Sequence, residues 1–163
     1  MFTYYSDILE IKNRLDKLES GEVEVKFTRL SETAIVPTYQ KDGDAGLDLS
    51  ADVSYTLRGG ETVAIPTGIA IELPEGYEAQ IRTRSGLSIK GIVVANSPGT
   101  IDAGFRGELC VILRNTNGIA YVAAKGNRIA QLVITRVAKV ALKEVSELSE
   151  TDRGTCGFGS SGI

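Results

Sequence analysis

Asp102 lies in a segment whose residue types could carry out acid–base chemistry on a bound ligand. The segment reads Asn96-Ser97-Pro98-Gly99-Thr100-Ile101-Asp102-Ala103-Gly104-Phe105-Arg106-Gly107-Glu108. An Asn followed by a Pro-Gly turn can present amide and backbone groups to the edge of a base. An aspartate close to an aromatic ring is also a candidate general base. A hairpin loop with a solvated aspartate explains the same residues equally well, so this segment alone leaves both interpretations open.

Two further segments have compositions that suit phosphate binding. The first, Arg82-Thr83-Arg84-Ser85-Gly86-Leu87, offers guanidinium donors, a hydroxyl and an approachable backbone. The second runs from Arg153 to Gly162 and offers glycine N–H groups, serine hydroxyls, a fixed positive charge and the Phe158 ring, which could stack on a base. An ordinary turn and a glycine tail without function are the respective alternatives. The Walker phosphate loop is excluded, because its Gly-Lys-Ser/Thr ending is missing.

Two more segments carry weaker signals. In Asp44-Ala45-Gly46-Leu47-Asp48-Leu49 the two carboxylates could bind a hard cation, although a turn that enters a strand also favours Asp and Gly. In Arg128-Ile129-Ala130-Gln131-Leu132 the apolar residues Ile129 and Leu132 predict a strand, and each has a polar neighbour in the sequence. This segment indicates no function by itself.

The absence of histidine narrows the possible chemistry. It excludes Ser-His-Asp and Cys-His nucleophilic catalysis and any zinc site with histidine ligands. Acid–base chemistry would then come from carboxylates, Lys, Tyr or Cys. Cys110 and Cys156 lack metal-ligand spacing and are expected to be free thiols. A hard metal such as Mg²⁺, bound by oxygen atoms, fits this composition better than zinc.

One segment at the start of the chain predicts a helix. Asp7 and Glu10 have the capping-box spacing, and Gly21 is a stop signal. Apolar residues recur between them at helical spacing, at Ile8, Ile11, Leu15 and Leu18. We expect this helix to pack on its own domain, because two heptads are too few for a coiled coil that stands alone.

The remainder of the chain has the two-residue period of strands. Alternation from Val23 to Phe27 predicts a half-buried strand. Further strands are predicted at Thr62–Ile65, Gly68–Leu73, Tyr77–Arg82, Ile89–Ala95, Leu109–Arg114, Ile119–Ala123 and Ile129–Val140. Many short strands with little helix indicate a sandwich or barrel. Residues 141–150 are expected to be a connector, and the glycine-rich end from Arg153 to be a mobile tail.

Composition sets the broad class. A chain of 163 residues with 42% hydrophobic and 24% charged residues is typical of one soluble globular domain. Its net charge of −3 argues against a nucleic-acid partner. The chain has neither a membrane-length apolar run nor a signal peptide, so no membrane partner and a cytoplasmic location are expected.

Together and in this order, the five segments resemble the five motifs of the trimeric dUTPase family. The resemblance runs from Asp44 to Gly162, about three quarters of the chain. It implies an all-β, distorted jelly-roll β-barrel that assembles as a homotrimer, with each active site built from all three chains. Residues 1–21 would then be a helical extension, 22–148 the barrel domain and 149–163 a flexible glycine-rich C-terminal arm.

The resemblance also implies an activity, which is Mg²⁺-dependent hydrolysis of dUTP to dUMP and pyrophosphate. Such an enzyme removes dUTP from the nucleotide pool and supplies dUMP for dTMP synthesis. Asp102 resembles the carboxylate that activates the attacking water, and Asp48 the residue that holds Mg²⁺ through water. The other residues that resemble substrate contacts are Arg84, Ser85, Gly86, Asn96, Gly99, Thr100, Ile101, Phe105, Gln131, Arg153, Phe158, Gly159, Ser160 and Ser161.

The chain departs from the family pattern at a few points. Phe105 stands where the family usually has Tyr, and Ser161 where Thr is frequent. Because stacking under a deoxyribose needs only the ring, selectivity for deoxynucleotides is expected to persist. Two alternatives remain open: a relative of dCTP deaminase, against which the Phe158 arm argues, and a regulatory protein that uses nucleotide binding to control an unknown partner, with the N-terminal helix as a possible contact.

Overall fold

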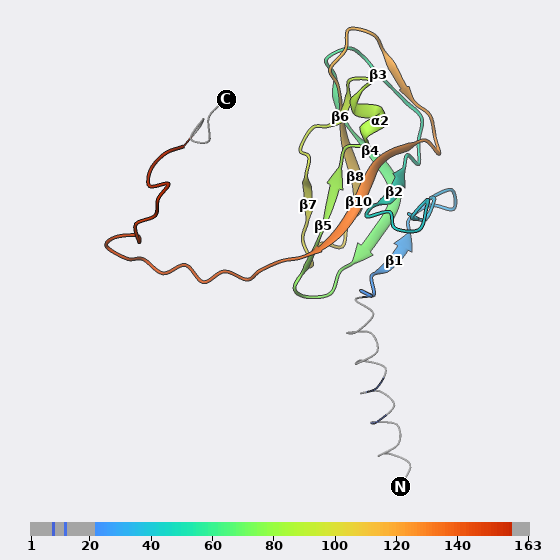
Figure 1. The fold of residues 1–163 in the computed structure, drawn as a ribbon. Coiled ribbons are helices and arrows are strands. Elements are labelled where there is room, and N and C mark those ends of the chain that lie inside the picture. Colours follow the sequence, from blue (N-terminus) through green and yellow to red (C-terminus); the bar gives the residue numbers. More distant parts are fainter. Residues whose placement is uncertain (1–7, 9–11, 13–21, 158–163) are drawn as a thin grey trace.

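The computed structural model describes residues 22–157 together with residues 8 and 12, and strands dominate this part of the chain (Figure 1). The strands are β1 (Lys26–Arg29), β2 (Leu47–Ser50), β3 (Tyr55–Leu57), β4 (Thr62–Glu72), β5 (Tyr77–Arg82), β6 (Ile92–Val94), β7 (Gly99–Ile101), β8 (Glu108–Asn115), β9 (Tyr121–Ala123) and β10 (Arg128–Arg136). Between β5 and β6 lies one short helix, α2 (Ser85–Ser88). The all-β fold class predicted from the sequence is confirmed.

The strands form two four-stranded sheets and a small two-stranded one. The strand orders are β1-β4-β8-β6, β2-β10-β5-β7 and β3-β9, and the strand pairs are antiparallel. One hydrophobic core joins the two larger sheets, with Ile69 and Leu113 contributed by one sheet and Leu49 and Ile129 by the other. Two antiparallel sheets around a common core are the arrangement of a jelly roll.

Strand β4 combines two of the predicted strands. The segments predicted at 62–65 and 68–73 form one continuous strand, and the register of its pairing with β8 shifts between Pro66 and Ala70. At Gly68 the φ angle is +68°, and a methyl group added there would lie 2.7 Å from Cβ of Ala34. Glycine is therefore required at this β-bulge, both for its conformation and for its lack of a side chain.

Two strand predictions were wrong in part. The strand predicted at 89–95 is confined to Ile92–Val94, because helix α2 precedes it and Gly91 has a φ angle of +69°. Ile89 is consequently 89% exposed. The strand predicted at 23–27 forms instead at Lys26–Arg29, and its residues are exposed rather than half-buried because β1 is an edge strand that pairs only with β4.

Several boundaries also differ from the predictions. Strand β10 ends at Arg136 rather than at Val140, and the short strands β3 and β7 were not expected from the sequence. After β10, residues 137–157 run away from the sheets, as Figure 1 shows.

The two ends of the chain are described only in part. Ile8 and Lys12 are helical, while the other residues of the predicted N-terminal helix lie outside the described residues. The described residues also exclude part of the predicted arm, namely Phe158, Gly159, Ser160 and Ser161. The domain boundaries predicted after residues 21 and 148 stay predictions. Across the described positions, no helix has both the length and the apolar character needed to cross a membrane.

Candidate functional site

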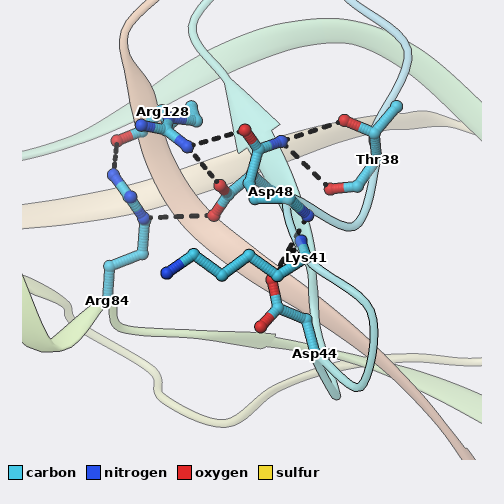
Figure 2. A network of polar contacts seen from close by, with 7 residues as sticks. Thr38, Lys41, Asp44, Asp48, Arg84 and Arg128 are labelled. Carbon is cyan, nitrogen blue, oxygen red and sulfur yellow. Dashed lines mark hydrogen bonds and ion pairs between the residues drawn. The ribbon is translucent and has the colours of Figure 1, made fainter.

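Three of the five chemistry-bearing segments meet in one network of charged side chains (Figure 2). Asp48 lies in β2, Arg128 begins β10, and Arg84 precedes helix α2. The strand register brings them together, because Gln131 of β10 pairs with Asp48 on one side and with Arg82 on the other. Segments that are far apart in the sequence therefore form one polar site at this end of the sheet.

Asp48 is the centre of the network and its most buried member. Its side chain is only 5% exposed, and its two carboxylate oxygens face different arginines. Oδ1 lies 3.1 Å from Nε of Arg84, and Oδ2 lies 3.1 Å from Nη1 of Arg128. A buried carboxylate needs such partners, because burial without them would strongly disfavour its charge.

Arg84 and Arg128 are also connected directly. Nη1 of Arg84 donates to the backbone carbonyl of Arg128 at 2.7 Å, and Nη1 of Arg128 donates to Oε1 of Gln40 at 2.9 Å. Two arginines share one carboxylate, so the network retains one net positive charge. Such an excess, next to the exposed Ser85 and Gly86 at the start of α2, suits an anionic ligand.

Asp44 does not join Asp48 in a cation site. Its Oδ2 accepts hydrogen bonds from the backbone N–H groups of Gln40 at 3.2 Å and Lys41 at 3.0 Å. Asp44 therefore closes the turn before β2, which is the simpler of the two interpretations that the sequence allowed. Separately, the N–H group of Asp48 donates to the carbonyl of Thr38 at 3.0 Å and fixes the start of β2.

The described residues suit a metal ion only in an indirect way. No group of three or more His, Cys, Asp or Glu side chains among them could hold a metal. Oδ1 of Asp48, however, is buried and accepts no hydrogen bond from the residues described, since its contact with Arg84 is an ion pair alone. Because this oxygen is ion-paired with Arg84, Asp48 fits only a Mg²⁺ ion that keeps its waters and binds mainly to substrate phosphates.

The segment from Asn96 to Ile101 consists of a turn and strand β7, which is tied to the strand that leads to Arg84. Strand β7 pairs with β5, with Gly99 opposite Ile81. Oγ1 of Thr83 accepts from the N–H group of Val94 at 2.8 Å. The amide of Asn96 lies over Gly99, since a methyl group added at Gly99 would be 2.9 Å from Nδ2. The sequence predicted Asn96, Gly99, Thr100 and Ile101 as base contacts, and they lie on this turn and strand.

Asp102 and Phe105 lie on the exposed turn that follows β7. The N–H group of Phe105 donates to the carbonyl of Asp102 at 3.0 Å. Nη1 of Arg106 donates to the carbonyl of Ala103 at 2.6 Å, which closes the turn. The Phe105 ring covers Gly107, where an added methyl group would lie 2.6 Å from Cζ. This turn therefore presents a carboxylate and an aromatic ring on one surface.

Within one chain, Asp102 is not near Arg84. Ile101 pairs with Ala79, so Asp102 follows at the Glu78 end of β5, whereas Arg84 lies beyond the other end of that strand. Arg84 lies six residues beyond Glu78 in an extended segment, a span of roughly 20 Å. These two predicted site residues are thus separated in a single copy of the chain.

Arg153 is also distant from this network. Its Nε donates to the carbonyl of Cys156 at 3.1 Å, so the guanidinium folds back on its own segment. That segment lies away from the sheets in Figure 1. The remaining residues predicted in the arm lie outside the described part of the chain.

The sequence analysis gave no role to Arg128 or Gln40. Two signals could have indicated Arg128. It stands before the apolar Ile129 at the start of a predicted strand, and Asp48, elsewhere in the sequence, required a positively charged partner. Tyr121 was also not anticipated: burial raises the pKa of its phenol, while the nearby charge of Arg84 acts in the opposite direction. Cys110 and Cys156 are free, as predicted, and burial raises the pKa of the Cys110 thiol.

Comparisons with known sequences all indicate one family. A family model described as dUTPase matches residues 32–162. A protein of Crocosphaera subtropica named deoxyuridine 5'-triphosphate nucleotidohydrolase is 49% identical over 142 residues, which cover 86% of this chain and 100% of the relative. A protein of the same name from Rickettsia bellii is 54% identical over 131 residues, covering 78% of this chain and 87% of the relative.

Solved structures resemble the whole fold. A mutant dUTPase of Staphylococcus bacteriophage 80alpha, solved with dUpNHpp, has a TM-score of 0.81 and 32% identity, covering 86% of this chain and 99% of that one. A second match is a mutant dUTPase of phage phi11 of S. aureus, whose description mentions a structural Mg(II) ion. It has a TM-score of 0.72 and 28% identity, and the match covers 78% of this chain and 99% of that one.

Proposed function

Because this chain belongs to the dUTPase family, we propose that it hydrolyses dUTP to dUMP and pyrophosphate. The match includes the five segments that carry the candidate chemistry, from Asp44 to Ser161. The activity would lower the concentration of dUTP and supply dUMP for dTMP synthesis. The relatives' names state the substrate, and the chain has the groups that such a reaction needs.

The reaction is an in-line attack of water on the α-phosphorus. Asp102 orients the water and accepts its proton, while the P–O bond to the departing pyrophosphate breaks. Arg84, Ser85, Gly86 and Gln131 bind the phosphates by charge-assisted hydrogen bonds and backbone donors.

The nucleoside is recognised by strand β7 and the turns on either side of it. Asn96 and the backbone from Gly99 through Thr100 to Ile101 read the uracil edge, where cytosine would offer a donor in place of the 4-carbonyl acceptor. Phe105 stacks under the deoxyribose. The arm closes the site and excludes water. Its contacting residues are Arg153, Phe158, Gly159, Ser160 and Ser161.

Asp48 would hold Mg²⁺ through water, because its Oδ1 accepts no hydrogen bond from the described residues, although it is ion-paired with Arg84. When bound, the ion adds positive charge that neutralises the triphosphate. Asp48 itself has a second function, because it also orients Arg84.

The separation of Asp102 from Arg84 is the observation that carries the assembly part of the proposal. Both residues must contact the same triphosphate, yet roughly 20 Å of strand β5 separates them in one chain. A homotrimer with shared sites resolves this, because Asp102 of one copy can face Arg84 of another. The exposed apolar residues after β10 also call for a partner surface; they are Val137, Val140, Leu142, Val145 and Leu148.

A substrate panel tests the proposed activity. Pyrophosphate release is measured with dUTP, dCTP, dTTP and UTP, each with Mg²⁺ and with a chelator. We expect rapid release from dUTP with Mg²⁺ and little from the other nucleotides. Ammonia release from dCTP would instead support the deaminase alternative, and no pyrophosphate from dUTP would refute the proposal.

A further inference from the structure

We infer that Arg128 and Gln40 form a positioning pair that keeps Arg84 oriented toward the phosphates and keeps the net charge of the network around it positive. The inference rests on the proposed function, because it concerns the binding of that substrate's phosphates. It adds two residues to which the sequence motifs assigned no role.

Arg84 is held at two points, and both depend on neighbouring strands. Its Nε faces Oδ1 of Asp48 at 3.1 Å, and its Nη1 donates to the carbonyl of Arg128 at 2.7 Å. An arginine side chain that is fixed before the ligand arrives loses less conformational entropy on binding. Nη2 of Arg84 donates to none of the described residues and remains free for a ligand.

The charge of Arg84 is useful only if Asp48 does not neutralise it. Asp48 is 5% exposed and forms ion pairs with both arginines. With Arg128 present, the carboxylate is shared and the network has one net positive charge. Without Arg128, Asp48 and Arg84 would form a neutral pair, and the attraction for a polyanion would fall.

Gln40 holds Arg128 in this arrangement. Its Oε1 accepts from Nη1 of Arg128 at 2.9 Å, and the same nitrogen donates to Oδ2 of Asp48 at 3.1 Å. Gln40 is exposed, so changing it alters the network without disturbing the core. A merely structural role would make Arg128 a link between β2 and β10, with no bearing on how tightly phosphates bind.

Two variants separate these accounts. Arg128→Gln removes one positive charge, and Gln40→Glu adds one negative charge beside Arg128 with almost the same shape. Both are expected to raise the calorimetric Kd for pyrophosphate, measured on the full-length protein with Mg²⁺, by roughly 10- to 100-fold. The Kd for deoxyuridine, which carries no phosphate, should change less than about twofold. Arg128→Lys, which keeps the charge, should bring the pyrophosphate Kd back to within about threefold of wild type.

Arg114→Gln is the matched control, since Arg114 is exposed on β8 and belongs to the other sheet. It changes the net charge equally and should leave both Kd values unchanged.

Unchanged pyrophosphate binding in both Gln40→Glu and Arg128→Gln would overturn the inference. If Arg128→Gln does not fold, Gln40→Glu decides alone. The binding assay does not depend on turnover. A wild-type protein that binds pyrophosphate but does not hydrolyse dUTP would therefore refute the proposed function and leave this inference to be judged separately.

Discussion

Asn96 and Gly99 depend on each other, because the Asn96 amide occupies the space that a side chain on residue 99 would fill. The sequence placed both residues in one segment and indicated that an amide there could read a base. It could not show that the amide lies over the glycine, because that contact depends on the conformation of the turn between β6 and β7. Asp48, Arg84 and Gln131 were likewise predictable as polar positions, whereas Arg128 became visible only through its contact with Asp48.

We expect Gly99→Ala to impair substrate selection more than stability. The new methyl group would be 2.9 Å from Nδ2 of Asn96, the far end of a flexible side chain, so the amide must move. The ratio of kcat/KM for dUTP to that for dCTP should fall by roughly tenfold or more, while the free energy of unfolding changes by less than about 1 kcal/mol. Steady-state kinetics and thermal unfolding measure the two effects.

Gly118→Ala is the control for this substitution, because an added methyl group there would meet nothing within 4 Å. An unchanged selectivity ratio in Gly99→Ala would mean that Asn96 does not read the base.

Among the elements, the bulge in β4 and the loops around it support the strands that carry the charged network. Asp52 follows β2 and accepts hydrogen bonds from Ser31 at 2.6 Å and Thr33 at 2.7 Å. Lys125, shortly before β10, donates to Thr33 at 2.7 Å and lies 3.7 Å from Asp52. Strands β5 and β10 were predicted from the sequence, whereas β2 was not among the predicted strands. The bulge was not predictable, because it depends on contact between Gly68 and two distant loops.

Gly68→Ala should destabilise the fold by about 2–4 kcal/mol. The substitution combines backbone strain at a φ angle of +68° with contacts of 2.7 Å to Ala34 and 2.9 Å to Asp52. Gly60→Ala separates these effects, since Gly60 has a φ angle of +77° and nothing within 4 Å of the added methyl group. Its cost should be only about 1 kcal/mol. Equal losses in denaturant unfolding would contradict the role assigned to the Gly68 contacts.

Asp52→Asn should lower Tm in a pH-dependent way. Hydrogen bonds from Ser31 and Thr33 hold the pKa of the Asp52 carboxyl below its usual value. A depressed folded-state pKa stabilises the protein above the unfolded pKa, and this stabilisation is lost as the pH falls through the folded pKa. The Tm difference between wild type and variant should therefore be present at pH 7 and shrink below about pH 4. A difference that does not vary with pH would contradict this account.

At the scale of the whole molecule, one chain does not bring the proposed site residues together. Asp102 and Arg84 lie at opposite ends of β5, and the segment after β10 leaves the sheets with its apolar side chains exposed. The sequence predicted shared sites only through resemblance to a family. No local pattern of residues reports which copy of a chain supplies which group, since that depends on how the folded copies pack.

Mixing two inactive variants tests the shared site most directly. Asp102→Asn removes the general base, and truncation after Asp152 removes the arm, so neither homotrimer should turn over dUTP. The two chains are unfolded together in equal amounts and refolded, and mixed trimers are confirmed by mass. A site works when a truncated chain supplies Asp102 and an Asp102→Asn chain supplies the arm. Activity should therefore return to about a quarter of wild type. No recovery in confirmed mixed trimers would contradict a site assembled from different copies.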